Sequence, residues 1–193
     1  MSKHTQRGFS LMEVLISLVI IAVGLLGMAA LQLRAQHAEL EALQRSQALI
    51  LVEDMANRIE TNRRSSTAQC YAVTDAISGA PFAGVDSAPF NCTAFGTNST
   101  REVAVADLER WDAMLDGAGE LLGGAGGVEV GAMTGARGCI VLLDPATDLY
   151  RVSVAWQGTI DTAAPSDPCA TGLYGAETKR RVVSRTFRLP TLN

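Results

Sequence analysis

The sequence predicts an α+β protein in which one long N-terminal helix is followed by a small antiparallel sheet. An apolar stretch near the N-terminus continues, without proline, into a region of helical periodicity. The last third of the chain shows strand-like alternation of side chains, interrupted by short turns. With 193 residues, the chain is long enough for one domain plus an extension.

The helix begins with a segment of membrane type. From Val14 to Leu31, eighteen residues carry no formal charge, and about 20 apolar residues in a helix span the hydrocarbon of a bilayer. The eight residues at the front contain Lys3 and Arg7 and no acid. Basic residues beside an apolar segment tend to stay in the cytoplasm, so we expect the rest of the chain on the other side of the membrane.

Beyond the apolar segment, the sequence predicts that the same helix continues to about Arg64. Val52, Met55 and Ile59 recur at steps of three and four, as on one face of an amphipathic helix. No proline occurs before Pro81, so a single helix on the order of 80 Å long is expected. Two glycines, Gly24 and Gly27, weaken it locally, and either close helix packing or local softening explains them.

The middle of the chain predicts a loop and then a second helix. From Arg63 to about Val103 the periodicity fades, and serine, threonine, glycine and proline accumulate. A helix is expected from Val105 to Leu122, with one apolar face made by Leu108, Trp111, Met114 and Leu115. We expect Trp111 to lie in the core.

The last third predicts an antiparallel sheet of about four strands. A short strand is expected at 128–130, and an apolar run at 139–143 precedes a turn at 144–148. Apolar and polar residues then alternate over 150–157, as in a strand with one buried face, and the final strand is expected at 181–189.

Four cysteines follow the membrane segment: Cys70, Cys92, Cys139 and Cys169. In an oxidising compartment, an even number of cysteines predicts two disulfides. Cys70 and Cys92 lie in one predicted loop, whereas Cys139 begins a predicted strand and Cys169 lies in the loop before the final strand. These places favour Cys70 with Cys92 and Cys139 with Cys169, although the sequence leaves the other pairings open. No Cys-x-x-Cys occurs and no histidine follows His37, so no metal site is expected.

Charge and composition argue against several classes of function. The net charge is −4, and removal of residues 1–8 would leave 14 basic and 20 acidic residues, a net charge of −6. Without a basic cluster, we expect no binding to nucleic acid. The region after the first helix has no histidine to act as a base and no Gly-x-Ser-x-Gly. We therefore predict no enzyme, no catalytic residue, no cofactor and no small-molecule substrate.

A short motif precedes the apolar segment: Gly8-Phe9-Ser10-Leu11-Met12-Glu13. A carboxylate near or inside lipid is costly, so Glu13 is expected to be paired or functional. It lies one helical turn after Phe9, on the same face. The simpler alternative is an acid favoured by the positive end of the helix dipole.

This arrangement resembles the class III signal of type IV prepilins. The resemblance implies that prepilin peptidase cleaves after Gly8 and methylates the new N-terminus at Phe9. It also implies that Glu13 meets the N-terminus of a neighbouring subunit during assembly. The implied pilin fold divides the chain into a leader (1–8), a transmembrane and assembly helix (9–33), its amphipathic continuation (34–64) and a disulfide-stapled globular head (65–193).

Three C-terminal segments extend the resemblance: Tyr150 to Gly158, Asp167-Pro168-Cys169 and Arg180-Arg181-Val182-Val183. They are similar to the end of PilV-type minor pilins, the type IV pilus modification proteins. The resemblance implies a minor pilin that joins other minor pilins and the major pilin in a complex priming pilus assembly, and that supports twitching motility and adhesion. It places the chain in the inner membrane as a single-pass protein, with a short cytoplasmic leader and a periplasmic head, and then in the pilus fibre.

Two alternatives remain at this point. A minor pseudopilin of a type II secretion system has the same signal and stalk, and the chemistry of the sequence does not separate it from a pilus subunit. An exported, membrane-anchored adhesin or hydrolase is the second alternative, and the missing histidine argues against a hydrolase.

Overall fold

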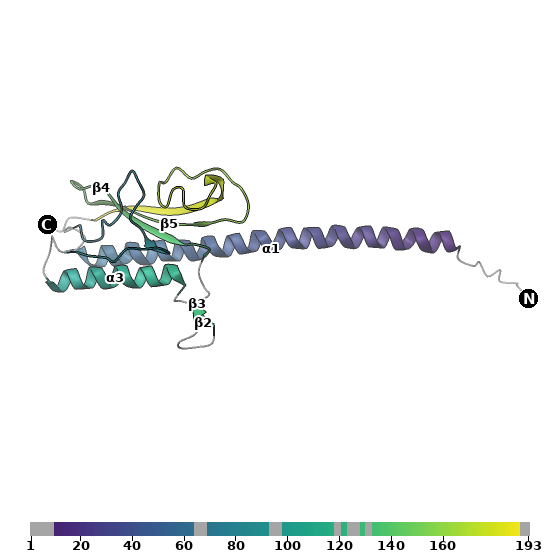
Figure 1. The fold of residues 1–193 in the computed structure, drawn as a ribbon, viewed down its shortest axis with the longest axis horizontal. Coiled ribbons are helices and arrows are strands. Elements are labelled where there is room, and N and C mark those ends of the chain that lie inside the picture. The colour runs from purple at the N-terminus through teal and green to yellow at the C-terminus, as the bar shows by residue number, and fades with distance from the viewer. Residues whose placement is uncertain are drawn as a thin grey trace, which may run out of the picture. The chain divides into compact units, whose positions relative to one another are not determined.

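The computed structural model describes residues 10–63, 69–92, 98–117, 121–122, 128–129 and 133–189. The chain divides into two compact units, Met1–Leu40 and Glu41–Asn193. Helix α1 (Leu11–Thr61) contributes to both, and the remaining elements belong to the second unit (Figure 1). The predicted order, a long apolar helix followed by an antiparallel sheet, is confirmed.

The first unit contains the apolar part of α1. Its large apolar side chains from Leu11 to Leu33 are all exposed, with exposed fractions from 47% at Val14 to 87% at Leu11. The helix runs without a break through Gly24 and Gly27. It is long and apolar enough to cross a membrane, and none of its most apolar window is buried against other parts of the protein. Such a surface requires lipid or other helices around it.

The core of the second unit begins where α1 becomes one-sided. Its buried residues follow helical spacing: Ala48, Val52, Met55, Ala56 and Ile59. Helix α3 (Asn98–Asp116) lies antiparallel to this part of α1, because Trp111 Nε1 donates to the Leu51 carbonyl at 3.0 Å and Arg58 Nη1 contacts Asp107 Oδ1 at 2.9 Å. The two helices form one layer beneath the sheet (Figure 1).

The second layer is a four-stranded sheet in the order β1-β4-β5-β6, in which all neighbours are antiparallel. Its strands are β1 (Ala83–Gly84), β4 (Arg137–Asp144), β5 (Leu149–Gln157) and β6 (Arg180–Arg188). The 3-10 helix η1 (Glu177–Lys179) leads into β6. Strands β2 (Leu121–Leu122) and β3 (Val128–Glu129) form a separate pair.

The predicted second helix was misplaced along the chain. A helix was expected from Val105 to Leu122, but α3 begins at Asn98 and ends at Asp116, and Leu121–Leu122 is a strand. The start carries Asn98, Ser99 and Thr100, residue types that favour helix N-termini. The end is set by Gly117, whose φ of +105° a continuing helix cannot use. Trp111 is fully buried, as predicted.

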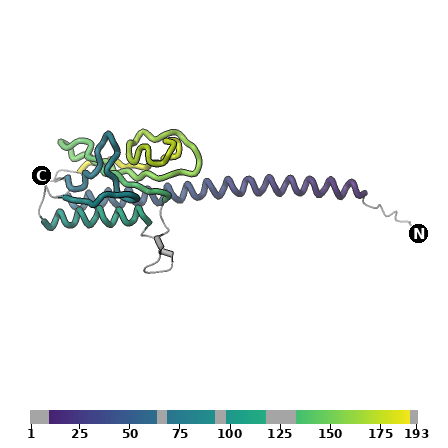
Figure 2. Tube along the Cα trace, in the orientation of Figure 1, coloured from purple at the N-terminus to yellow at the C-terminus, as the bar shows by residue number. Residues whose placement is uncertain are grey.

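The expectation that β5 has one exposed face was wrong. Tyr150, Val152 and Val154 face the helices, as predicted, but Ser153 and Ala155 on the other face are also buried, at 1% and 0% exposed. The segment between β5 and β6 folds back over that face (Figure 2). Cys169, Ala170 and Tyr174 of this segment pack with Ala155, so the sheet is covered on both sides here. A single-strand pattern could not reveal a cover supplied by a distant loop.

The close contact between the layers predicts that Gly138 does not tolerate a side chain. A Cβ there would lie 2.2 Å from Trp111 Cη2 and 2.7 Å from Leu115 Cδ1. We expect Gly138→Ala to lower the free energy of unfolding by about 1–3 kcal/mol through overpacking. Urea denaturation of the oxidised protein measures this, with Ser184→Ala on an exposed strand position as the control, expected within about 0.5 kcal/mol of wild type. Equal stability of the two variants would contradict the tight fit.

Candidate functional site

The N-terminal end of α1 carries the residues predicted for processing and docking. Gly8 and Phe9 lie outside the described residues. The helical hydrogen bonds begin at the Ser10 carbonyl, which accepts from Glu13 N at 3.0 Å and Val14 N at 3.3 Å. Glu13 therefore occupies the first turn of α1, where the helix dipole favours a negative charge.

The carboxylate of Glu13 is exposed and has no ion pair within the described part of the chain. Its neighbours on the helix surface, Met12 and Ile16, are exposed apolar side chains at 70% and 55%. An unpaired carboxylate in such surroundings is costly when lipid or apolar helices replace water. A cation brought by another chain would remove that cost, so Glu13 is suited to meet one.

In the second unit, Glu41 holds the start of the loop after β5. Its Oε1 accepts from Thr159 N at 3.3 Å, Thr159 Oγ1 at 3.1 Å and Ile160 N at 3.4 Å. The same oxygen lies 3.3 Å from Arg181 Nη2. Partial burial opposes the charged form, but these hydrogen bonds and the Arg181 charge outweigh it and hold the pKa of Glu41 below its usual value. The loop, the helix and strand β6 are thereby joined at one carboxylate.

Two further acids on α1, Glu53 and Glu60, bind β6 through Arg185. Arg185 Nη1 lies 2.5 Å from Glu53 Oε2, and Arg185 Nη2 lies 3.1 Å from Glu60 Oε1. The sequence analysis did not predict these contacts, because it considered only the apolar face of this helix. The available signal was the spacing of Arg181 and Arg185, which places both side chains on one face of the predicted strand.

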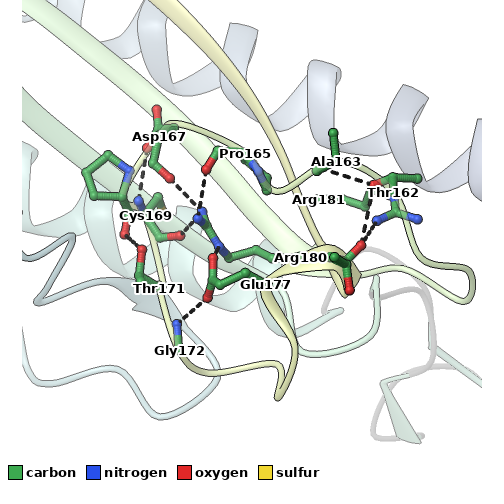
Figure 3. A network of polar contacts seen from close by, with 12 residues as sticks. Thr162, Ala163, Pro165, Asp167, Cys169, Thr171, Gly172, Glu177, Arg180 and Arg181 are labelled. Carbon is green, nitrogen blue, oxygen red and sulfur yellow. Dashed lines mark hydrogen bonds and ion pairs between the residues drawn. The ribbon is translucent and has the colours of Figure 1, made fainter.

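The loop after β5 is built around the buried guanidinium of Arg180, which is 3% exposed (Figure 3). Its Nε contacts Glu177 Oε2 at 2.6 Å. Its terminal nitrogens donate to three backbone carbonyls: Asp167 at 2.6 Å, Cys169 at 3.0 Å and Pro165 at 3.2 Å. One side chain thus satisfies carbonyl groups that burial would otherwise leave without donors.

Glu177 links this network to the rest of the loop. Its Oε1 accepts from Gly172 N at 2.7 Å, and this bond, together with Arg180, holds the pKa of Glu177 below its usual value. Asp167 accepts from Ser153 Oγ at 2.7 Å on β5. The loop is therefore attached to the sheet by polar contacts on both sides of its disulfide.

The four cysteines form two disulfides, Cys70–Cys92 and Cys139–Cys169. Their Cα atoms are 5.3 Å and 5.8 Å apart, both within the range that a disulfide spans. The first closes a segment between α1 and α3, and the second fixes the loop after β5 to β4. The described residues contain no group of three or more histidine, cysteine or acidic side chains that could hold a metal ion.

Two family models match the chain. Residues 3–29 match the prokaryotic N-terminal methylation motif, and residues 30–108 match type IV pilin Tt1218. The type IV pilin model thus covers less than half of the chain, directly after the methylation motif. The methylation motif implies processing by prepilin peptidase and pilin assembly, and the type IV pilin family that residues 30–108 resemble is structural rather than enzymatic. No curated protein and no solved structure matches the chain.

The contacts of Glu41 predict a pH-dependent contribution to the stability of the second unit. Because the folded-state pKa lies below the usual value of 4.5, the contribution is complete above that value and is lost as the pH falls through the lowered pKa. We expect Glu41→Gln to lower the melting temperature at pH 7, and the difference from wild type to shrink below pH 4. Thermal scans at both pH values measure this, and a constant difference would exclude a role for the charge.

The burial of Arg180 predicts a larger effect from its removal. Arg180→Met leaves the carbonyls of Pro165, Asp167 and Cys169 without their donor, so we expect a loss of at least about 2 kcal/mol of unfolding free energy. Arg188→Met, an exposed change on the same strand, is the control and is expected within about 0.5 kcal/mol of wild type. Urea denaturation that gives the same midpoint for both variants would contradict the central place of Arg180.

Proposed function

We propose that this pilin is a minor subunit of the PilV type, which joins other minor pilins in a complex that primes assembly of the pilus. The likeness of its C-terminal segments to PilV-type minor pilins supports the finer assignment. These segments are β5, the disulfide-bound loop and the start of β6, which the Arg180 network and the Cys139–Cys169 bridge join into one body. Because these similar segments pack against one another, their similarity to PilV-type minor pilins supports the assignment more strongly than similarity at scattered positions would.

In this proposal, the chain consists of a cleaved leader, a transmembrane helix with its continuation, and a periplasmic head. Residues 1–8 are a leader that prepilin peptidase removes after Gly8, and Phe9 becomes the methylated N-terminus. Residues 9–33 are the transmembrane and assembly helix, residues 34–64 continue it, and residues 65–193 form the disulfide-stapled head. The protein is held in the inner membrane with its head in the periplasm, and then enters the pilus fibre with the major pilin.

The observation that carries the proposal is the unpaired, exposed carboxylate of Glu13 in the first turn of an exposed apolar helix. In the proposal, the methylated N-terminus of a neighbouring subunit supplies the cation that Glu13 lacks. The apolar surface then moves from lipid to neighbouring helices. Burial of such surface is worth about 25 cal/mol per Å² against water, but lipid already shelters it, so the net gain is smaller and extraction from the membrane is feasible.

The test compares piliation and twitching of a deletion strain complemented with wild type, Glu13→Ala or Glu39→Ala. Glu39 is an exposed acid on the same helix without an ion pair among the described residues, so it is the matched control. We expect wild type and Glu39→Ala to restore pili and Glu13→Ala to fail, with a loss of surface pili of at least about tenfold. Without the Glu13 carboxylate, the N-terminal amine of the neighbouring subunit stays unpaired among apolar helices, which costs several kcal/mol.

Other results would change the assignment. Full restoration by Glu13→Ala would exclude the docking role of this carboxylate. Normal pili in the deletion strain, together with failed secretion of exoproteins, would identify a minor pseudopilin of a type II secretion system. Normal pili and normal secretion with reduced attachment would favour a membrane-anchored adhesin.

A further inference from the structure

The two sides of the four-stranded sheet differ in how far their backbone groups are hydrogen-bonded. At the β4 edge, β1 pairs with Arg137 and Gly138. Further along, Thr74 N donates to the Ile140 carbonyl at 3.0 Å, and Ile140 N donates to Thr74 Oγ1 at 3.0 Å. These contacts cover the first half of the β4 edge with the chain's own backbone and side chains.

At the β6 edge, the hydrogen-bond pattern shows which backbone groups point outward. Just beyond the ends of the ladder, Leu189 N donates to the Asp148 carbonyl at 3.2 Å, and Gly158 N donates to the Lys179 carbonyl at 2.8 Å. Hydrogen-bonded positions alternate along an antiparallel pair, so the odd-numbered residues of β6 bond to β5. The residues whose N–H and C=O groups face away from β5 are therefore Val182, Ser184, Thr186 and Arg188.

Within the described residues, none of these four outward-facing residues has a backbone hydrogen bond to another part of the chain. The strand is also regular: β6 pairs with β5 without a register shift over nine residues and contains no proline. Natural proteins usually protect such edges with bulges, proline, short strands, charged side chains or covering segments, and among the described residues β6 has only the charged side chains. The Arg181 and Arg185 side chains bend toward α1, over the sheet's inner face, and so leave the edge itself open.

The charges along β6 distinguish one residue from the others. Arg180 is paired with Glu177, Arg181 with Glu41, and Arg185 with both Glu53 and Glu60. Arg188 is exposed and has no ion pair within 4 Å among the described residues, and its charge contributes only a minor part of the lowered pKa of Asp144 at the end of β4. It stands at the C-terminal end of the outward-facing row.

We propose that the open edge of β6 binds an extended segment of another protein chain as a fifth strand, with an acidic side chain beside Arg188. The row of outward donors and acceptors repeats every second residue, and only an extended backbone matches that repeat. The unpaired guanidinium adds a preference for an acidic side chain in the bound segment. A second copy of β6 contains no acidic residue that could pair with Arg188, so an acidic segment of a different chain fits the edge better than a second copy does.

The first experiment measures hydrogen exchange of the full processed chain in detergent, alone and in complex with the other minor pilins of its own filament system. We expect the amides of Ser184, Thr186 and Arg188 to exchange rapidly in the isolated chain and to become at least about tenfold slower in the complex, because each gains a hydrogen-bond partner. Unchanged exchange in the complex would overturn the proposal. Protection that rises with the concentration of the isolated chain would overturn the choice of partner, since a second copy would then occupy the edge.

The second experiment uses variants that separate the outward backbone from the side chain. Thr186→Pro removes one outward N–H and leaves the β5 ladder intact, which is where sheets tolerate proline. Thr186→Val keeps the N–H and a branched side chain and is the matched control. We expect the proline variant to bind the minor-pilin complex about tenfold more weakly and the valine variant to bind like wild type. Equal binding by all three, or equal loss in both variants, would overturn the proposal.

Thermal denaturation and piliation distinguish failure of the edge proposal from misfolding and from failure of the proposed function. Thermal denaturation identifies a proline variant that fails to fold, and the exchange result on the unmutated chain then decides. The proposal relies on the proposed function only for the choice of partner proteins. If wild type restores piliation and Thr186→Pro does so equally, the edge proposal fails while the minor-pilin role stands. If wild type does not restore piliation, the minor-pilin role itself fails.

Discussion

The structure depends on one helix that must satisfy two different surroundings. In its first part, every large apolar side chain from Leu11 to Leu33 is exposed, so this segment is stable only with lipid or other helices around it. From Ala48 to Ile59, the same helix buries a single stripe against the sheet and α3. The sequence shows this change from a helix that is apolar all round to a helix with one apolar face, and the change separates the exposed apolar segment from the residues of the core.

The head is fixed to the helix by charge as well as by apolar packing. Glu41, Glu53 and Glu60 lie on α1, and two arginines of β6 reach them. Exposed ion pairs alone contribute little, but Glu41 also accepts three hydrogen bonds from the loop at Thr159 and Ile160, and it is largely shielded from solvent. These contacts set the position of β6 along α1, whereas the apolar stripe supplies most of the stability.

Local sequence patterns predicted the helices and strands better than they predicted helix boundaries or the burial of the sheet's outer face. The helical stripe at Val52, Met55 and Ile59, the buried Trp111, the turn at 144–148 and the strands expected at 139–143, 150–157 and 181–189 were predicted because each depends on nearby residues. The remaining strand of the sheet was predicted wrongly: β3, within the strand expected at 128–130, pairs with β2 outside the four-stranded sheet, and the fourth strand is β1, in a segment expected to be a loop. The limits of α3 were missed because Asn98 and Gly117, which set them, were not weighed as boundary signals. The burial of Ser153 and the Arg180 network could not be predicted, since both depend on a loop that returns to the sheet. At the N-terminus, Glu13 was singled out by its place beside an apolar run, and the structure shows it exposed in the first turn of α1.

The contacts that hold β6 in the sheet also make its outer edge rigid. Arg181 and Arg185 hold the strand from the helix side, the β5 ladder holds it over nine residues, and Arg180 anchors its beginning. A strand held on these sides loses little conformational freedom when a further strand is added, so most of the energy of new backbone hydrogen bonds is available for binding. A flexible edge of the same sequence would have to be ordered first. The rigidity of β6 is thus what would make its four outward-facing backbone positions a specific binding surface.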